Sequence, residues 1–158
     1  MKTIRENVFE TNSSSTHTLV YSETANVDGY VPKSDKVIVN FIDTNDEHIL
    51  YSLRDKVSYL VSHIINTYKW DCESYEDLKE QVERCHDFQR IAEHVKQTYG
   101  KEVVLPKTYS GYLEDIVSIN HQLYNSNLDG VLEDLVEHNF DYLAEVLAPN
   151  QVIEIGHD

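Results

Sequence analysis

A long helical period of apolar residues dominates the first half of the chain. Between residues 46 and 69, apolar side chains recur every three or four positions, the spacing of one face of an α-helix. They are Ile49, Leu50, Leu53, Val57, Leu60, Val61, Ile64, Ile65 and Tyr68. We therefore expect a helix over residues 46–69, capped by Asn45 or Asp46, that buries this stripe against a core.

A second helical pattern follows after a short polar interval. Ser74 with Asp77 approximates a capping box, and Gly100 stands where a left-handed residue commonly ends a helix. The apolar residues between them form one stripe: Leu78, Val82, Cys85, Phe88, Ala92, Val95 and Tyr99. Because the connecting loop is short, we expect residues 74–99 to form a helix that folds back on the first as an antiparallel hairpin.

Strand signals and a third helix complete the pattern. Apolar, β-branched runs predict strands at residues 18–22, 37–42, 103–105 and 152–155. A helical period over residues 128–147, closed by Pro149, predicts a third helix. We expect an α+β fold in which a small sheet of short strands packs with a long helical hairpin and a third, acidic helix. A chain of 158 residues has the usual size of one domain, so we expect a single domain over residues 1–158.

The chain has a formal net charge of −15, and this charge is unevenly distributed. Residues 108–158 contain 10 acidic residues and no lysine or arginine, whereas residues 1–40 contain 5 acidic and 4 basic residues. An acidic surface repels nucleic acid and anionic membranes, which are bound through basic contacts. It attracts basic proteins, so we expect a basic host protein as the partner and no direct contact with nucleic acid or membrane.

The sequence also predicts a compartment. No run approaches the roughly 18 apolar residues that span a bilayer, and residues 1–10 lack the apolar core of a signal peptide. We therefore expect a cytoplasmic protein. Its two cysteines, Cys72 and Cys85, are expected to be reduced thiols, with Cys85 acting as a small hydrophobic residue of the second helix.

Acidic residues form a regular row on the predicted third helix. They recur every four positions, with one further acid beside the row: Asp129, Glu133, Asp134, Glu137, Asp141 and Glu145. Like charges four residues apart cost a few tenths of a kcal/mol each on an isolated helix, and no basic residue of that helix relieves them. The row indicates either a regular negative surface that occupies a basic groove as a nucleic-acid mimic, or a solvated face of a generally acidic protein.

Short polar residues cluster near the N-terminus. Hydroxyl groups and backbone N–H groups in a tight turn bind phosphate or carboxylate, an imidazole acts as acid or base, and a guanidinium neutralises an anion. The candidate ligand-binding residues are Arg5, Asn12, Ser13, Ser14, Ser15 and His17. The alternative is that Asn12 and the serines cap a turn through bonds to their own backbone.

This N-terminal string carries a resemblance to a known group of proteins. With Arg5 and Phe9 ahead of it, the run Glu-Thr-Asn-Ser-Ser-Ser-Thr-His of residues 10–17 resembles a motif of a group of bacterial and bacteriophage proteins. Residues 119–123 and the closing Gly-His-Asp of residues 156–158 look similar to two further elements of that group. Asn120 and Leu123 depart from the pattern, which has an acid and a hydroxyl there. The resemblance implies a phage or mobile-element origin and candidate positions, but no activity.

Catalytic patterns are sparse. The candidate catalytic residues are Ser13, Ser14, His17, His121 and His157, and a serine–histidine–aspartate trio could be drawn from Ser14, His121 and Asp158. However, the chain lacks the Gly-x-Ser-x-Gly turn that exposes a nucleophilic serine. None of the eight histidines shows paired metal-ligand spacing, and no glycine-rich phosphate loop is present. We therefore predict no metal and no cofactor.

Two functional hypotheses follow. The first is an acidic accessory protein, derived from a phage or mobile element, that binds a basic host protein as a nucleic-acid mimic or inhibitor. The second is a small enzyme, or a phosphate- or nucleotide-binding protein, with its site on residues 12–17. The second hypothesis predicts that residues 12–17, His121 and the C-terminal tripeptide meet in space.

Overall fold

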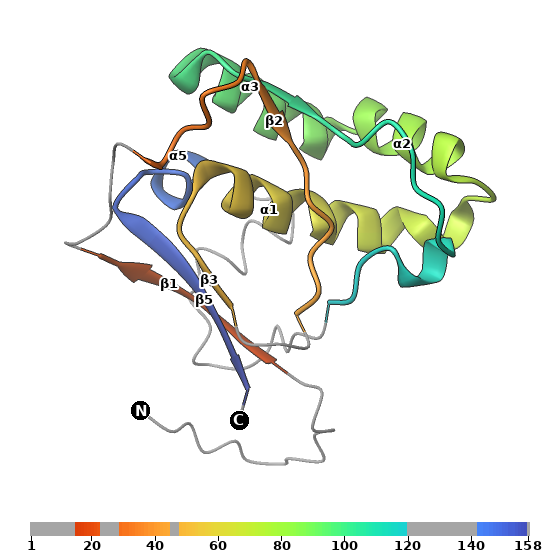
Figure 1. Cartoon of the computed structure of the whole chain (residues 1–158), viewed down its shortest axis with the longest axis horizontal. Helices are drawn as coiled ribbons and strands as arrows, with labels where there is room; N and C mark the ends of the chain where they lie inside the picture. Colours follow the sequence, from red (N-terminus) through yellow and green to blue (C-terminus); the bar gives the residue numbers. More distant parts are fainter. Residues whose placement is uncertain (1–14, 23–28, 45–47, 120–141, 158) are drawn as a thin grey trace.

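The computed structural model describes residues 15–22, 29–44, 48–119 and 142–157. This part of the chain contains both helices and strands, which confirms the predicted α+β fold (Figure 1). In chain order the elements are β1 (Ser15–Tyr21), β2 (Lys36–Ile38), β3 (His48–Leu50), α1 (Leu53–Tyr68), η2 (Lys69–Asp71), α2 (Tyr75–Arg84), α3 (His86–Tyr99), β4 (Glu102–Val104), η3 (Leu113–Asp115), α5 (Leu143–Val146) and β5 (Gln151–His157), where η marks a 3₁₀ helix.

The strands form two small sheets instead of the single sheet expected from the sequence. β5 lies between β1 and β3 in a three-stranded antiparallel sheet, so the last strand of the described chain pairs with the first. β2 and β4 form a separate parallel pair with Val37 opposite Val103. Strand order is set by pairing between segments distant in sequence, which an apolar run does not encode.

The first helix begins later than predicted. α1 starts at Leu53, and the Ser52 hydroxyl caps it by accepting a hydrogen bond from the backbone N–H of Asp55 at 3.1 Å. The assignment of a helix from residue 46 was therefore wrong, because residues 48–50 form β3. Ile49 and Leu50 continue the helical period, but they pair with β5 instead. Sheet pairing overrides the local period here.

The second predicted helix is interrupted in the middle. Cys85 has extended backbone angles, φ −70° and ψ 151°, so residues 75–99 form two helices, α2 and α3. The Cys85 thiol caps α3 by accepting from the N–H of Phe88 at 3.4 Å. The predicted role of Cys85 within a helix was wrong for this reason. The caps at Ser74 and at Gly100, which has φ +69°, are confirmed.

α1 binds the strand segment beside it through its hydroxyl groups. The predicted strand over residues 37–42 keeps ladder pairing only over Lys36–Ile38. Beyond that point, Ser58 accepts from the N–H of Asn40 at 2.8 Å, and Ser62, one helical turn on, accepts from the N–H of Ile42 at 3.2 Å. Buried serine hydroxyls thus replace a neighbouring strand for these two N–H groups.

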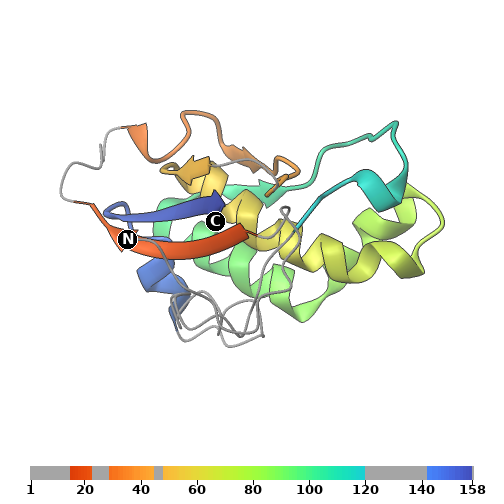
Figure 2. The ribbon, with the colours of Figure 1, turned by 90° about the horizontal axis from the view of Figure 1, so that it is seen from below.

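One hydrophobic cluster joins these elements. α1 lies between the three-stranded sheet and the α2–α3 pair, which runs back along it (Figures 1 and 2). The cluster reaches from Leu19 on β1 to Ile155 on β5 and includes Leu53 and Val57 of α1, both without exposed surface. Among the described residues, no helix has the length and apolar character needed to cross a bilayer. The predicted helix over residues 128–147 lies mostly outside the described part of the chain. Of that range the structure describes residues 142–147, which include α5.

Candidate functional site

The β1–β5 pairing brings two of the three predicted site segments together. Ser15, at the end of the N-terminal motif, is the cross-strand partner of His157, and Thr16 is the partner of Gly156. The third segment, around His121, lies outside the described residues, as do Asp158 and the start of the motif. The register therefore supports proximity of the motif and the C-terminal tripeptide.

His17 lies in the interior. Its side chain has no exposed surface, and its Nδ1 is 2.7 Å from the hydroxyl oxygen of Tyr59 on α1. The ring of His63, one turn further along α1, lies edge-on to Tyr59 with 4.7 Å between centroids. Burial raises the pKa of Tyr59 well above its ordinary value, so its hydroxyl stays protonated. In this state His17 links the sheet to the central helix, and it has no surface on which to meet a substrate.

Most of the other candidate residues lie outside the described part of the chain. These are Arg5, Asn12, Ser13, Ser14, His121, Asp129, Glu133, Asp134, Glu137 and Asp141. Glu145 is the one member of the acidic row that is described, and it lies exposed on α5. The acidic row as a whole stays a prediction.

The most extensive buried polar contact belongs to Lys56, which the sequence analysis did not single out. Its ammonium group has no exposed surface and donates to the carbonyl oxygens of Val146, Ala148 and Gln151 at 2.6, 2.8 and 2.9 Å. Burial lowers its pKa to about 7. Its burial could have been predicted from its position, because Lys56 stands three residues after Leu53 and therefore lies on the apolar face of the helix.

Tyrosines complete this arrangement at the end of α5. The carbonyl of Leu147 accepts from the hydroxyls of Tyr30 and Tyr99 at 2.5 and 2.7 Å. The last carbonyls of a helix lack partners within the helix and carry the negative end of its dipole. An ammonium and two hydroxyls satisfy them here, so Lys56, Tyr30 and Tyr99 fix the chain leading into β5.

Lys69 repeats the same device at the other end of α1. Its ammonium donates to the carbonyls of Glu114 and Val117, both at 2.9 Å, and lies 4.8 Å from the centre of the Trp70 ring. Burial lowers the pKa of Lys69, and the carboxylates of Asp115 and Glu114 partly offset this. Lys69 therefore holds η3 against η2.

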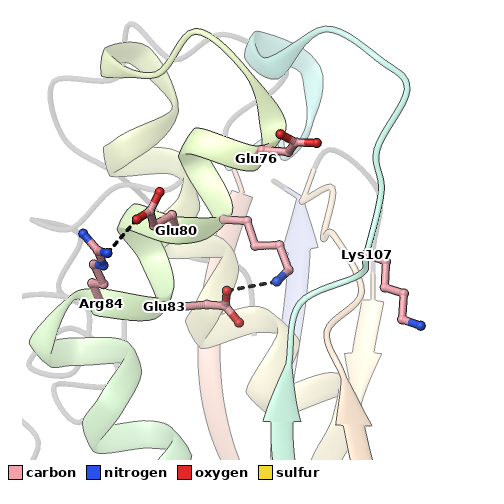
Figure 3. Close-up of a pocket in the computed structure, with 6 residues that line it drawn as sticks. Glu76, Glu80, Glu83, Arg84 and Lys107 are labelled. Carbon is pink, nitrogen blue, oxygen red and sulfur yellow. Dashed lines mark hydrogen bonds and ion pairs between the residues drawn. The ribbon is translucent and has the colours of Figure 1, made fainter.

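A groove of about 470 Å³ is lined by side chains of α2 and by Lys107 of the segment after β4 (Figure 3). Its lining is Glu76, Lys79, Glu80, Glu83, Arg84 and Lys107, so three acids face three bases. Lys79 pairs with Glu83 at 3.0 Å and Arg84 with Glu80 at 2.7 Å, while the Lys107 side chain points away from the other residues drawn (Figure 3). Balanced charge gives this groove no preference for a basic or an acidic ligand.

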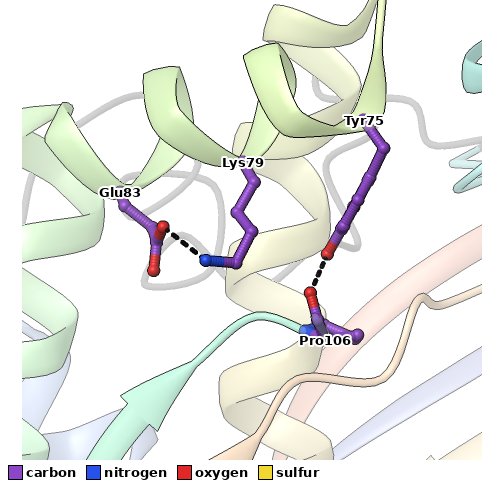
Figure 4. A network of polar contacts seen from close by, with 4 residues as sticks. All are labelled: Tyr75, Lys79, Glu83 and Pro106. Atoms are coloured by element: carbon purple, nitrogen blue, oxygen red, sulfur yellow. Dashed lines mark hydrogen bonds and ion pairs between the residues drawn. The ribbon is translucent and has the colours of Figure 1, made fainter. Parts of the chain in front are cut away.

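The inner side of α2 is fixed to the segment after β4. Tyr75 donates its hydroxyl proton to the carbonyl of Pro106 at 2.5 Å, close to the Lys79–Glu83 pair (Figure 4). Its ring contacts those of Phe41 and Tyr109, with centroids 6.1 and 5.9 Å away. These contacts support the fold and offer no exposed catalytic group.

Metal-binding groups were sought in the part of the chain that the structure describes. No three histidine, cysteine, aspartate or glutamate side chains converge there as a metal site would require. Cys72 and Cys85 are both free thiols. Comparison of the chain with protein-family models, curated proteins and solved structures found no match.

Proposed function

We propose that this protein is an acidic binding protein that engages a basic partner protein. One observation carries the proposal: the fold buries cations but, in its described part, no acids. Lys56 and Lys69 are buried on backbone carbonyls, and the buried charged residues include no aspartate or glutamate. The described part of the chain contains 11 lysines and arginines, of which 9 lie outside the interior, and 16 aspartates and glutamates, none of which is buried. The surface of this part is therefore more acidic than its residue counts alone indicate.

The acidic row would supply the regular part of this surface. Residues 129, 133, 137, 141 and 145 are all acidic, and four residues of helix rise about 6 Å. A row with this spacing resembles the repeat of phosphates along a nucleic-acid strand. We infer that a basic nucleic-acid-binding protein is the partner, with this protein as its mimic or inhibitor. A phage or mobile-element source, as the N-terminal motif implies, would suit such a role.

Affinity capture from host lysate tests the proposal. The tagged wild-type protein would be compared with a Glu133→Lys, Glu137→Lys, Asp141→Lys variant at about 50 mM and about 500 mM salt. We expect a basic protein to bind at low salt, to dissociate at high salt and to be absent from the variant, because attraction between exposed charges is screened.

A matched control keeps the total charge change but moves it elsewhere. Glu73→Lys, Glu76→Lys, Glu80→Lys places the same six-unit change on exposed residues of α2 and its approach. This variant should retain at least part of the binding. A partner indifferent to salt and to both variants, or capture of no basic protein, would refute the proposal.

The Ser15–His157 pairing favours one second candidate, a phosphate-binding site at the N-terminal motif. Such a ligand would raise the unfolding temperature of the folded protein by mass action. We would measure thermal unfolding with about 10 mM inorganic phosphate for wild type and for Ser13→Ala, Ser14→Ala. A stabilisation lost in the variant would support this candidate, and no stabilisation would remove it.

A further inference from the structure

The two most exposed large hydrophobic side chains in the described part of the chain lie on neighbouring turns. Tyr112 is 76% exposed and Trp70 is 67% exposed. Trp70 belongs to η2, and Tyr112 directly precedes η3, which contacts η2. Tryptophan and tyrosine are the side chains most enriched at the energetic centres of protein interfaces. Two such side chains on adjoining turns are the kind of surface at which protein partners bind.

We call the surface formed by Trp70, Asp71, Tyr112, Glu114 and Asp115 the aromatic corner. Its backbone is held in place before any partner binds. Lys69 joins its two turns through the carbonyls of Glu114 and Val117, and the N–H of Asp115 donates to the carbonyl of Tyr112 at 3.1 Å. Behind η3, Val117 is only 2% exposed and anchors the turn in the core. A surface that is already ordered loses little conformational entropy on binding.

The exposed charged side chains of the aromatic corner are all acidic, because the one lysine beside them, Lys69, is buried with its ammonium group 4.8 Å from the centre of the Trp70 ring. Asp71 on η2 and Glu114 and Asp115 on η3 are exposed. Residues 66–78 contain a single basic residue, the buried Lys69, and residues 108–119 contain none. Carboxylates beside exposed aromatic faces suit guanidinium or ammonium groups, through charge-assisted hydrogen bonds and cation–π contacts. The same carboxylates repel the phosphates of a nucleic acid.

We propose that the aromatic corner, formed by Trp70, Asp71, Tyr112, Glu114 and Asp115, docks an arginine- or lysine-rich segment of the partner protein. This rests on the proposed function, because it names the surface through which a basic partner is gripped. The aromatic rings supply the short-range contact. The acidic surface elsewhere supplies long-range attraction.

Trp70 is the only tryptophan of the chain, so its fluorescence reports on the aromatic corner alone. The wild-type protein would be titrated at about 50 mM salt with a decapeptide of alternating arginine and glycine, and with a glutamine–glycine decapeptide as control. We expect the arginine peptide to change Trp70 emission saturably and the glutamine peptide to leave it unchanged. Calorimetry of the same titration measures total binding, wherever it occurs.

Variants locate the binding. Tyr112→Ala should weaken binding of the arginine peptide about tenfold, and Glu114→Gln, Asp115→Asn by a similar factor. Tyr51→Ala is the matched control, because Tyr51 is 56% exposed but precedes α1, whereas Trp70 follows it. This control should bind as wild type does. Circular dichroism would confirm that each variant is folded.

The outcomes separate this inference from the proposed function. The aromatic corner would be ruled out as the docking surface if calorimetry detected binding of the arginine peptide without a change in Trp70 emission. Equal losses of affinity in Tyr112→Ala and Tyr51→Ala would rule it out as well. Either result would leave the proposed acidic binding protein intact. No basic peptide bound at all, together with an empty capture from lysate, would refute both. Quenching of Trp70 by a single-stranded oligonucleotide instead of the peptide would also overturn the inference, because it would identify a stacking platform.

Discussion

Buried lysines are the residues that most distinguish this protein. Lys56 and Lys69 lie near the two ends of α1, and each ammonium group donates to backbone carbonyls of distant segments. Burying a charge without hydrogen-bond partners is prohibitively costly, so their carbonyl partners are essential to the fold. The two lysines tie the C-terminal half of the chain to the central helix.

The first prediction concerns Lys56→Met. At about pH 7 we expect a loss of about 3 kcal/mol in the free energy of unfolding, because three buried carbonyls lose their donor. Burial lowers the folded-state pKa of Lys56 to about 7. Above that pH the unfolded chain therefore binds more protons, and wild-type stability gains from rising pH. The deficit of the variant should thus grow by roughly 2 kcal/mol between about pH 7 and about pH 9.

Urea unfolding of both proteins at the two pH values measures this. Tyr59, Cys72 and Cys85 have raised pKa values through burial, and they act equally in both proteins, so the difference isolates Lys56. Lys79→Met is the control, since its partly exposed pair with Glu83 is worth only about 0.5 kcal/mol. A deficit that stays constant or shrinks with pH would contradict the assigned pKa.

At the scale of elements, α1 organises both sheets. Its serine hydroxyls accept the backbone N–H groups of residues 40 and 42, as a neighbouring strand would. The Tyr59 hydroxyl of α1 contacts His17 of β1. Predictions made from periodicity found α1, most of α2 and α3, and the strands at both ends of the described chain. They failed at residues 48–50 and at Cys85, where pairing with β5 and a thiol cap decided the backbone.

The second prediction is that Ser58→Ala, Ser62→Ala destabilises the protein by about 2 kcal/mol. Each change leaves a strand N–H without its acceptor, at a cost of about 1 kcal/mol apiece. Urea denaturation monitored by circular dichroism measures the effect. Thr67→Ala is the control, because the exposed Thr67 hydroxyl only returns to the carbonyl of His63 in its own helix. Equal stability of the double variant and the control would show that water replaces the serines.

For the whole molecule, the single domain over residues 1–158 stays a prediction, and the core cluster supports it. That cluster contains residues of β1, α1, α3, α5 and β5, so the two ends of the described chain share one interior. A core of this kind favours cooperative unfolding.

The third prediction follows from that shared core. We expect a single urea transition with the same midpoint by far-ultraviolet circular dichroism, which reports helices, and by the near-ultraviolet signal of the eleven tyrosines. Two separated midpoints would instead indicate that part of the chain folds independently.

Four features could be predicted from the residues alone: the α+β class, the core stripe of α1, the caps at Ser74 and Gly100, and the excess of acidic charge. These depend on local spacing, local hydrogen bonds and residue counts. Contacts in three dimensions placed β5 between β1 and β3, buried Lys56 and Lys69, turned His17 inward, and put η2, which carries Trp70, against η3, which Tyr112 precedes. Each depends on contacts between residues far apart in the chain, and such contacts leave little trace in local pattern.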